Sequence, residues 1–141
     1  MSIEENKALV RRYFAELNRG NFEAAEECLA PGFVRYNVAG TTIDRAGYCQ
    51  FLRRVAKEIP DIHRTIDDMV AEGNKVVACF TWAGTDTGGF GGGPATGRRL
   101  AVPEVYIARI EGGKIADFRQ SADRLGVYHQ LGKSPPAPPA P

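Results

Sequence analysis

The 141-residue chain has few of the residues that build disulfide frameworks or metal centres. Its three cysteines, Cys28, Cys49 and Cys79, lie far apart and show no CxxC spacing. We therefore expect reduced thiols in a cytoplasmic protein. The two histidines, His63 and His129, have no second histidine or cysteine at ligand spacing, so the sequence predicts no metal site.

The chain also lacks an excess of charge of either sign and a long apolar run. Lys and Arg number 18 against 17 Asp and Glu, a formal net charge of +1, so no broad attraction to nucleic acid or to a membrane is predicted. No apolar run approaches the length of a membrane span, and no basic, apolar leader opens the sequence. Both features favour the cytoplasmic interpretation.

Glycine is plentiful, but its arrangement does not match a phosphate-binding loop. The segment 85–94, TDTGGFGGGP, fits neither GxxxxGK[ST] nor a GxGxxG that joins a strand to a helix. We interpret it instead as a mobile lid over a pocket.

Apolar residues suffice for one core, since 43% of the chain is hydrophobic and 25% is charged. These values predict a single domain, which we place at residues 1–132. Residues 133–141, KSPPAPPAP, favour the polyproline conformation and have no apolar side chain of any size. We expect them to form a disordered, Pro-rich tail.

Apolar residues at helical spacing predict three helices in the first 60 residues. The first begins with a possible capping box at residues 2–5, SIEE, and ends at Gly20. Asn21 can cap a short second helix, which Ala30-Pro31-Gly32 would break. Asp44 can cap a third helix that ends before Pro60.

The rest of the chain has the pattern of strands. We expect strands at residues 33–38, 64–72, 75–84, 100–110 and 115–123, with a short apolar segment, 125–131, folding back onto them. Helices followed by an antiparallel meander indicate an α+β fold. The predicted architecture is a cone: a curved antiparallel sheet that three N-terminal helices cover on one face, leaving a hollow.

The hairpin at residues 100–123 determines which side chains face that hollow. A three-residue loop with a bulge pairs Tyr106 with Phe118 and Glu104 with Gln120, whereas a two-residue Gly-Gly loop pairs Tyr106 with Arg119. We favour the bulged turn, because it avoids burying Arg119. A few polar groups on an otherwise apolar inner face are typical of a ligand pocket.

Four residues are candidates for catalysis. Glu104 is the only carboxylate on the predicted inner face, where burial would raise its pKa and suit a general acid or base; the alternative is an ordinary salt bridge. Tyr106 and Gln120 could donate hydrogen bonds to a substrate carbonyl or be satisfied core groups. Asp86 is either an acid/base at the cavity mouth or a turn former, and Asp123 is predicted to cap the closing segment.

Five further residues are candidates for contact with the apolar body of a substrate. They are Tyr13, Asn37, Trp82, Phe90 and Phe118. Taken singly, each of the four aromatic residues is better explained as core, whereas the Asn37 amide can equally satisfy a nearby backbone group.

Three segments resemble the SnoaL-like polyketide cyclase family, which shares the nuclear transport factor 2 fold. They are residues 82–99 (WAGTDTGGFGGGPATGRR), 104–118 (EVYIARIEGGKIADF) and 122–132 (ADRLGVYHQLG). With the helical opening, the resemblance covers nearly all of residues 5–132. It implies a cone-shaped α+β barrel, a homodimer or homotetramer, and an apolar cavity for a small hydrophobic substrate.

The resemblance also implies a type of chemistry. Well-known members close a ring of an aromatic polyketide by an intramolecular aldol reaction without metal or organic cofactor, using an Asp on the last strand and a His on the strand before. Aligned by the shared GGKI and QLG motifs, the Asp position falls on Gln120 and the His position on Tyr106. A Gln amide cannot take up a proton, although it can donate a hydrogen bond to an oxyanion.

These departures leave several functions open. The leading hypothesis is a cofactor-independent tailoring enzyme that acts on a polyketide-like molecule as a cyclase, isomerase or hydroxylase. The alternative is a non-catalytic module that binds a small hydrophobic ligand with Gln120 and Tyr106 as neutral polar groups.

Overall fold

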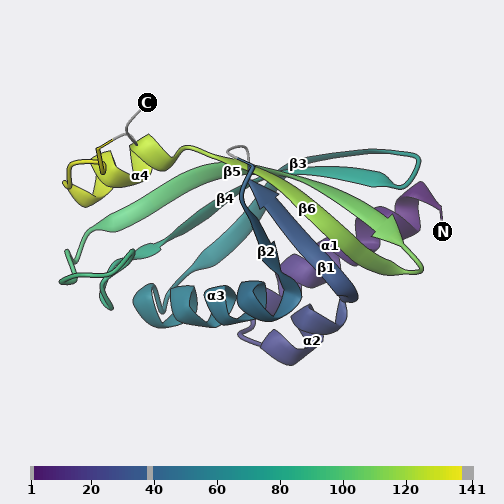
Figure 1. Ribbon diagram of the computed structural model, residues 1–141, viewed down its shortest axis with the longest axis horizontal. Coiled ribbons are helices and arrows are strands. Elements are labelled where there is room, and N and C mark those ends of the chain that lie inside the picture. Colours follow the sequence, from purple (N-terminus) through teal and green to yellow (C-terminus); the bar gives the residue numbers. More distant parts are fainter. Residues whose placement is uncertain (1, 38–39, 138–141) are drawn as a thin grey trace.

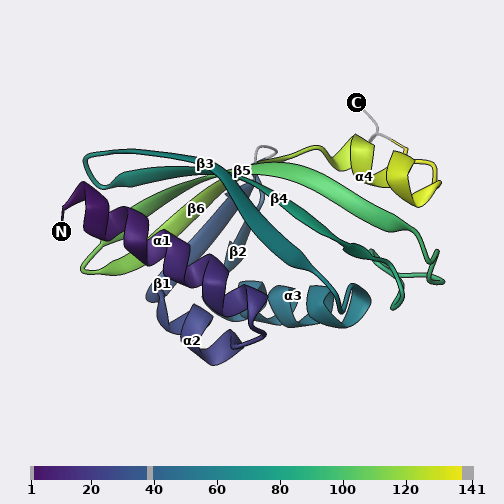
Figure 2. The ribbon, with the colours of Figure 1, turned by 180° about the vertical axis from the view of Figure 1, so that it is seen from behind.

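The computed structural model describes residues 2–37 and 40–137, and they form one sheet with helices on one side of it. The elements in chain order are α1 (Ile3–Asn18), α2 (Phe22–Glu27), β1 (Leu29–Asn37), β2 (Thr42–Asp44), α3 (Arg45–Glu58), β3 (His63–Glu72), β4 (Lys75–Thr85), β5 (Arg99–Glu111), β6 (Lys114–Ala122) and α4 (Arg124–Leu131). Helices α1 to α3 lie under the curved sheet, and α4 lies at the end remote from the N-terminus (Figures 1 and 2). The predicted α+β architecture with N-terminal helices is confirmed.

Three of the predicted helix caps form as expected, because each needs only residues that are close in sequence. The Ser2 Oγ accepts the Glu5 amide at 3.1 Å, and the Glu5 carboxylate accepts the Ser2 amide in return. Asp44 accepts the amide of Gly47 at 2.9 Å at the start of α3. Asp123 caps α4 through the Gly126 amide, also at 2.9 Å.

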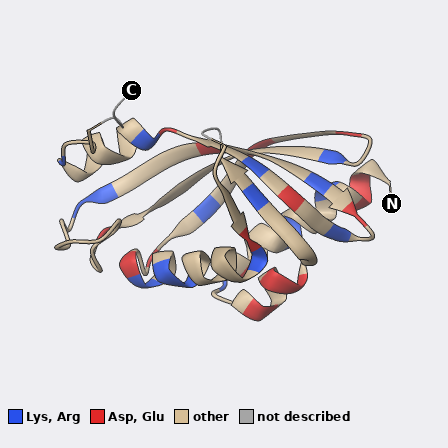
Figure 3. Ribbon diagram, viewed as in Figure 1, with Lys and Arg blue, Asp and Glu red and all other residues tan. Residues whose placement is uncertain are grey.

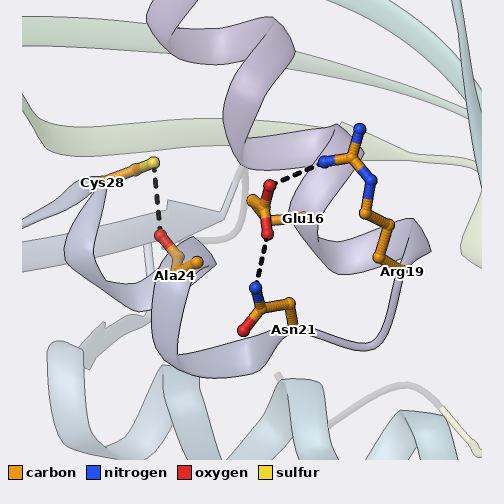
Figure 4. A network of polar contacts seen from close by, with 5 residues as sticks. All are labelled: Glu16, Arg19, Asn21, Ala24 and Cys28. Atoms are coloured by element: carbon orange, nitrogen blue, oxygen red, sulfur yellow. Dashed lines mark hydrogen bonds and ion pairs between the residues drawn. The ribbon is translucent and has the colours of Figure 1, made fainter.

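The predicted cap of α2 is wrong, and Figure 4 shows what the side chain does instead. Asn21 has a backbone ψ of 74° and makes no side-chain hydrogen bond to the helix that follows. Its Nδ2 donates to Glu16 at 2.8 Å, while the other oxygen of Glu16 pairs with Arg19 at 2.6 Å. The Cys28 thiol donates to the Ala24 carbonyl at 3.5 Å. Asn21 therefore ties the corner to α1 rather than capping α2.

The first strand begins earlier than predicted. β1 starts at Leu29, which is 2% exposed and pairs with Ile115 of β6. The register then shifts between Leu29 and Val34, so Pro31, which has no amide donor, lies in an irregular stretch that interrupts the ladder. The tripeptide at residues 30–32 bends the strand instead of separating a helix from it.

The sheet is mixed rather than wholly antiparallel, which corrects the prediction. Its strand order is β2-β1-β6-β5-β4-β3, and β1 runs parallel to β6. Parallel neighbours need a long crossover, and here nearly all of the intervening chain supplies it. Residues 40 and 41 lead into β2, which pairs antiparallel with β1.

Neither predicted register of the β5–β6 hairpin is correct. Glu111 pairs with Lys114 across a two-residue Gly112-Gly113 turn, in which both glycines have positive φ. The register then shifts by one residue between Ile110 and Arg109. The hairpin therefore combines a tight turn with a separate bulge, an arrangement that neither prediction considered.

The bulge nevertheless places the predicted residues on one face. Tyr106 lies opposite Gln120 rather than Phe118, and Glu104 lies opposite Ala122 rather than Gln120. The observed partner of each β5 residue lies two residues further along β6 than the favoured register predicted. Because side chains alternate with a period of two, a shift of two residues leaves the same side chains on the inner face. Arg119 remains exposed, as expected.

Aromatic side chains fill the space between the sheet and the helices. The Phe118 ring, fully buried, lies 4.6 Å from Tyr106 and 5.4 Å from both Tyr13 and Phe33, measured between ring centroids. Three hydroxyls form a chain, with Tyr13 to Tyr48 at 3.2 Å and Tyr48 to Tyr106 at 3.1 Å. Burial raises the pKa of all three tyrosines, so these hydroxyls stay neutral and satisfy one another.

The C-terminal segment folds back onto the sheet as predicted. The Gln130 side chain accepts the Ala101 amide at 2.8 Å and donates to the Ala101 carbonyl at 3.0 Å, which joins α4 to β5. Basic and acidic positions are interspersed over the sheet and the helices, apart from acidic α2 (Figure 3). Within the described ranges, no helix is long and apolar enough to cross a membrane.

Candidate active site

The candidate site is a pocket of about 560 Å³ lined by residues of β1, α3, β4 and the loop after it, the middle of β5, the end of β6, and α4. Figure 1 shows these elements gathered at the end of the sheet remote from the N-terminus. The residues that line it are Arg35, Asn37, Thr41, Phe51, Arg54, Glu58, Trp82, Phe90, Gly91, Gly92, Glu104, Gln120, Ala122, Arg124, Val127, Tyr128, Leu131 and Lys133.

A second hollow, of about 760 Å³, lies between the start of α1 and the tips of two hairpins. It is lined by Ser2, Ile3, Asn6, Gly73, Asn74, Ile110, Gly112 and Gly113. None of these side chains titrates near neutral pH, whereas the lining of the smaller pocket includes two carboxyl groups, Glu58 and Glu104.

Glu104 lies partly buried on β5 and contacts two donors. The Trp82 indole donates to Oε1 at 3.2 Å, and the Gln120 amide donates to Oε2 at 3.1 Å. Burial raises the pKa of Glu104, and the two hydrogen bonds, which favour the charged form, only partly offset this effect. The carboxyl group is thus oriented, faces the pocket and is easier to protonate than an ordinary glutamate.

Gln120 connects Glu104 to an arginine that the sequence analysis did not single out. Arg35 of β1 donates from Nη1 to the Gln120 Oε1 at 3.0 Å. Its guanidinium carbon lies 5.6 Å from the Tyr48 ring centroid and 5.3 Å from that of Phe51. The side chains therefore form a continuous chain from Arg35 through Gln120 to Glu104.

A sequence signal for Arg35 exists, although it is weak. Phe33, Arg35 and Asn37 alternate along β1 and so share a face. Phe33 is buried and Asn37 lines the pocket. An arginine between two inward positions is unusual enough to mark a polar site. The other cationic lining residues, on α3 and near α4, follow from tertiary packing and have no such pattern.

The predicted substrate-contact residues divide into two groups. Trp82 and Phe90 line the pocket, with their rings in an edge-to-face arrangement at 5.5 Å. Asn37 also lines it, and its Oδ1 accepts the Thr41 amide at 3.1 Å, so the amide satisfies the backbone as well. Tyr13 and Phe118 are not among the lining residues, because both belong to the closed aromatic core.

Tyr106, a predicted catalytic residue, is also absent from the pocket lining. It is 6% exposed, and its hydroxyl contacts Tyr48 rather than open space. Gln120, which does line the pocket, is its partner across the β5–β6 ladder. Tyr106 therefore supports the floor of the site.

Asp86 is fully buried, and its hydrogen bonds all stay within its own loop. It accepts the amides of Gly89, Phe90 and Thr96 at 3.0, 2.6 and 3.0 Å, and the Thr96 hydroxyl at 2.8 Å. Burial would raise the pKa of Asp86, but these four donors outweigh it and lower the pKa below its usual value. This geometry favours the turn-former interpretation over an acid/base at the cavity mouth.

Comparisons with known proteins agree with this arrangement. A family model described as SnoaL-like polyketide cyclase matches residues 7–131. Aklanonic acid methyl ester cyclase DnrD of Streptomyces peucetius is 46% identical over 55 residues, which are 39% of this chain and only 38% of DnrD.

Solved structures extend the likeness to the whole fold. TsrD from Streptomyces laurentii is 33% identical with a TM-score of 0.83, covering 94% of this chain and 98% of TsrD. AclR from Streptomyces galilaeus, a proposed hydroxylase, is 26% identical with a TM-score of 0.87, covering 97% of this chain and 91% of AclR. The family match spans the sheet, the helices and the pocket, so this chain belongs to the SnoaL-like polyketide cyclase family, with the nuclear transport factor 2-like fold.

Proposed function

We propose that this chain is a cofactor-independent enzyme that moves protons on an aromatic or polycyclic polyketide-like substrate, with Glu104 as the general acid/base. The observation that carries the proposal is the partly buried Glu104 carboxyl group, which faces the pocket with a raised pKa. A carboxyl group of this kind can accept and return a proton near neutral pH. Trp82 and Phe90 supply an apolar wall for the body of the substrate.

The position of the carboxyl group explains the missing aspartate of the family pattern. The resemblance assigns the acid/base to the position of Gln120 on β6, where this chain has an amide. The Gln120 amide donates to Glu104 on β5 at 3.1 Å, so the two side chains occupy one site. We interpret this as a relocation of the carboxylate to the neighbouring strand, while the amide orients it.

The proposed reaction is ring closure by aldol addition. Glu104 takes a proton from a carbon next to a carbonyl, and the resulting enolate carbon attacks a second carbonyl of the same molecule. One carbon–carbon bond forms, and the oxygen of the attacked carbonyl receives the proton back, so no atoms are gained or lost. Isomerisation uses the same proton transfers without the new bond. The name of DnrD supports ring closure as the first choice.

The test is turnover of Glu104→Gln on aromatic polyketide intermediates, with aklanonic acid methyl ester among them. We expect a loss of about 10²–10⁴-fold in kcat with nearly unchanged binding, because the amide keeps the shape but cannot exchange the proton. Glu23→Gln, on the exposed face of α2, is the matched control and should leave turnover unchanged. Full turnover by Glu104→Gln would refute the acid/base role.

A double variant tests the relocation. Glu104→Gln combined with Gln120→Asp replaces the carboxylate on β5 by an amide and places a carboxylate at the position that the family resemblance assigns to the acid/base. We expect at least a tenfold recovery of kcat over Glu104→Gln. A double variant no more active than Glu104→Gln would contradict the relocation.

Two other outcomes are distinguished by the mass of the product. The likeness to AclR supports hydroxylation as a second candidate, and a product heavier by one oxygen would favour it. Tight binding with the ligand recovered unchanged would favour the non-catalytic binding module. A new product of unchanged mass would support cyclisation or isomerisation.

A further inference from the structure

The pocket contains more positive charge than the protein as a whole. Its lining includes four cations, Arg35, Arg54, Arg124 and Lys133, and two carboxyl groups, Glu58 and Glu104. With every group ionised, the lining has an excess of two positive charges, whereas the whole chain has a net charge of +1. The residues outside the lining therefore sum to a negative value. Positive charge is concentrated at the site.

Most of this charge is not neutralised within the pocket. Arg54 pairs with Glu58 at 3.5 Å. Among the residues that the structure describes, neither Arg35 nor Arg124 nor Lys133 forms an ion pair. The pocket thus offers cationic groups to a ligand in surroundings that are less screened than the open surface.

Arg35 is the cation closest to the proposed chemistry, and it is incompletely satisfied. Its one hydrogen bond to a described residue goes from Nη1 to the neutral amide of Gln120. Its Nε is buried and has no acceptor within residues 2–37 and 40–137. The guanidinium packs over Tyr48 and Phe51, which hold its plane in place. A preorganised guanidinium of this kind is suited to a carboxylate.

We propose that Arg35 binds a carboxylate on the substrate, so that the pocket selects a free aromatic acid over its methyl ester. This inference rests on the proposed function and goes beyond it, because the relative DnrD is named for a methyl ester. The anionic oxygens meet the guanidinium, while Phe51, Trp82 and Phe90 enclose the rings. The guanidinium carbon of Arg54 lies 5.4 Å from the Phe51 ring centroid, so a second positive charge adds to the attraction.

Gln120 makes this selection compatible with the acid/base role of Glu104. The amide lies between the guanidinium and the carboxyl group and bonds to both. An aspartate at position 120 would pair directly with Arg35 and neutralise it. The glutamine therefore leaves the Arg35 charge available to the substrate and separates Glu104 from direct contact with the guanidinium.

The chain provides its own probe for a binding test. Trp82 is the only tryptophan in the sequence, and it lines the pocket. Quenching of its fluorescence by anthraquinone-2-carboxylate and by the methyl ester of the same acid measures the two affinities directly. We expect the acid to bind at least tenfold more tightly than the ester, with a ratio that falls as salt is added. Equal affinities for the two probes would overturn the proposal without any variant.

Substitutions of Arg35 test whether this residue causes the preference for the acid over the ester. Arg35→Met should reduce the acid-to-ester ratio to about one, and Arg35→Lys should keep part of it, because the charge stays while the fork of donors is lost. Arg11→Met, on the exposed surface of α1, is the matched control. A full preference in Arg35→Met, or its loss only in Arg54→Met, would overturn the assignment. Circular dichroism confirms folding, and Arg35→Lys carries the test if Arg35→Met unfolds.

One further variant separates this proposal from the proposed function. Glu104→Gln should keep the full preference for the acid while losing turnover. A preference that disappears in Glu104→Gln would overturn the role of Arg35, whereas retained turnover would refute only the acid/base role of Glu104.

Discussion

Glu104 on β5 and Asp86 in the loop after β4 are both carboxylic acids, and their surroundings shift their pKa values in opposite directions. Around Glu104, burial outweighs two donated hydrogen bonds and raises the pKa. Around Asp86, four hydrogen bonds from the loop outweigh burial and lower it. The number of donors, rather than burial alone, therefore separates a proton-transfer group from a structural anion.

The raised pKa of Glu104 predicts how stability depends on pH. Since the folded pKa lies above the unfolded value near 4.5, ionisation of Glu104 opposes folding. The stability of the native protein relative to Glu104→Gln should be greatest below pH 4.5 and should fall as pH rises through the folded pKa. Urea unfolding of both proteins from pH 4 to pH 8 measures this difference. A difference that does not change with pH would contradict the raised pKa.

The hydrogen bonds of Asp86 predict that Asp86→Ala loosens the loop that carries Phe90. We expect a loss of about 2–4 kcal/mol in the free energy of unfolding at neutral pH, because three amides and a hydroxyl lose a charged acceptor. The lowered pKa means that this stabilisation is present above pH 3.8 and is lost as pH falls through the folded pKa.

The measurement is chemical unfolding together with amide exchange at Gly89, Phe90 and Thr96. Asp67→Ala is the control, since Asp67 is exposed and accepts a single hydroxyl, from Thr81 at 2.7 Å. We expect Asp67→Ala to lose less than about 1 kcal/mol of the free energy of unfolding. Equal losses in the two variants would show that the loop does not depend on Asp86.

At the scale of elements, the β5–β6 hairpin places the site. A one-residue change in pairing would reverse the faces of Glu104 and Gln120. The bulge between Arg109 and Ile110 prevents this, because it adds one residue to the shift that the Gly112-Gly113 turn begins. The Arg109 guanidinium then contacts Asp117, its cross-strand partner, at 2.7 Å, which stabilises the register next to the bulge.

The loop after β4 contacts α3 through a close backbone approach at Gly88. Its amide donates to the Glu58 carbonyl at 2.9 Å, and a Cβ here would overlap the Lys57 carbonyl oxygen and lie 2.7 Å from the Glu58 Cα. We expect Gly88→Ala to lower the free energy of unfolding by about 1–3 kcal/mol and to weaken ligand binding, because the backbone of the loop or of α3 must move to make room for the Cβ. Gly32→Ala, with open space around it, should have little effect. Thermal unfolding of both variants tests this, and equal behaviour would contradict it.

At the scale of the whole molecule, the pocket lies where the sheet, α3, the loop and α4 meet, far from the N-terminus (Figure 2). Residues remote in sequence, such as Arg35 and Gln120, meet there. The buried rings of Tyr13, Tyr106 and Phe118 pack next to this end without lining the pocket. The homodimer or homotetramer implied by the family resemblance stays a prediction, which sedimentation of the purified chain would test.

The Pro-rich segment predicts tolerance to truncation. Residues 134–137 are exposed and have no regular secondary structure, and residues 138–141 lie outside the described ranges. Removal of residues 134–141 should change the free energy of unfolding by less than about 0.5 kcal/mol, because the part of this segment that the structure describes, residues 134–137, is exposed. Lys133 is kept because it lines the pocket. A larger loss, measured by urea unfolding, would indicate a structural role for the tail.

The amino-acid sequence by itself determined the features that depend on neighbouring residues. The caps at Ser2, Asp44 and Asp123, the three N-terminal helices and the glycine turn of the last hairpin follow from contacts three or four residues apart. Alternation placed Glu104 with Tyr106 on one face of β5, and Gln120 with Phe118 on one face of β6, because side-chain direction within a strand is local.

Only the tertiary structure determined which strands are neighbours, in which register they pair, and which distant side chains meet. The parallel contact of β1 with β6, the shifted register of β5 with β6 and the bond from Arg35 to Gln120 join distant segments. Such pairings depend on how the whole sheet closes over the helices, and a local pattern is compatible with several of them. The sequence therefore predicted Glu104, Gln120 and Trp82 as candidates, while the fold added Arg35 and the contacts that join these side chains.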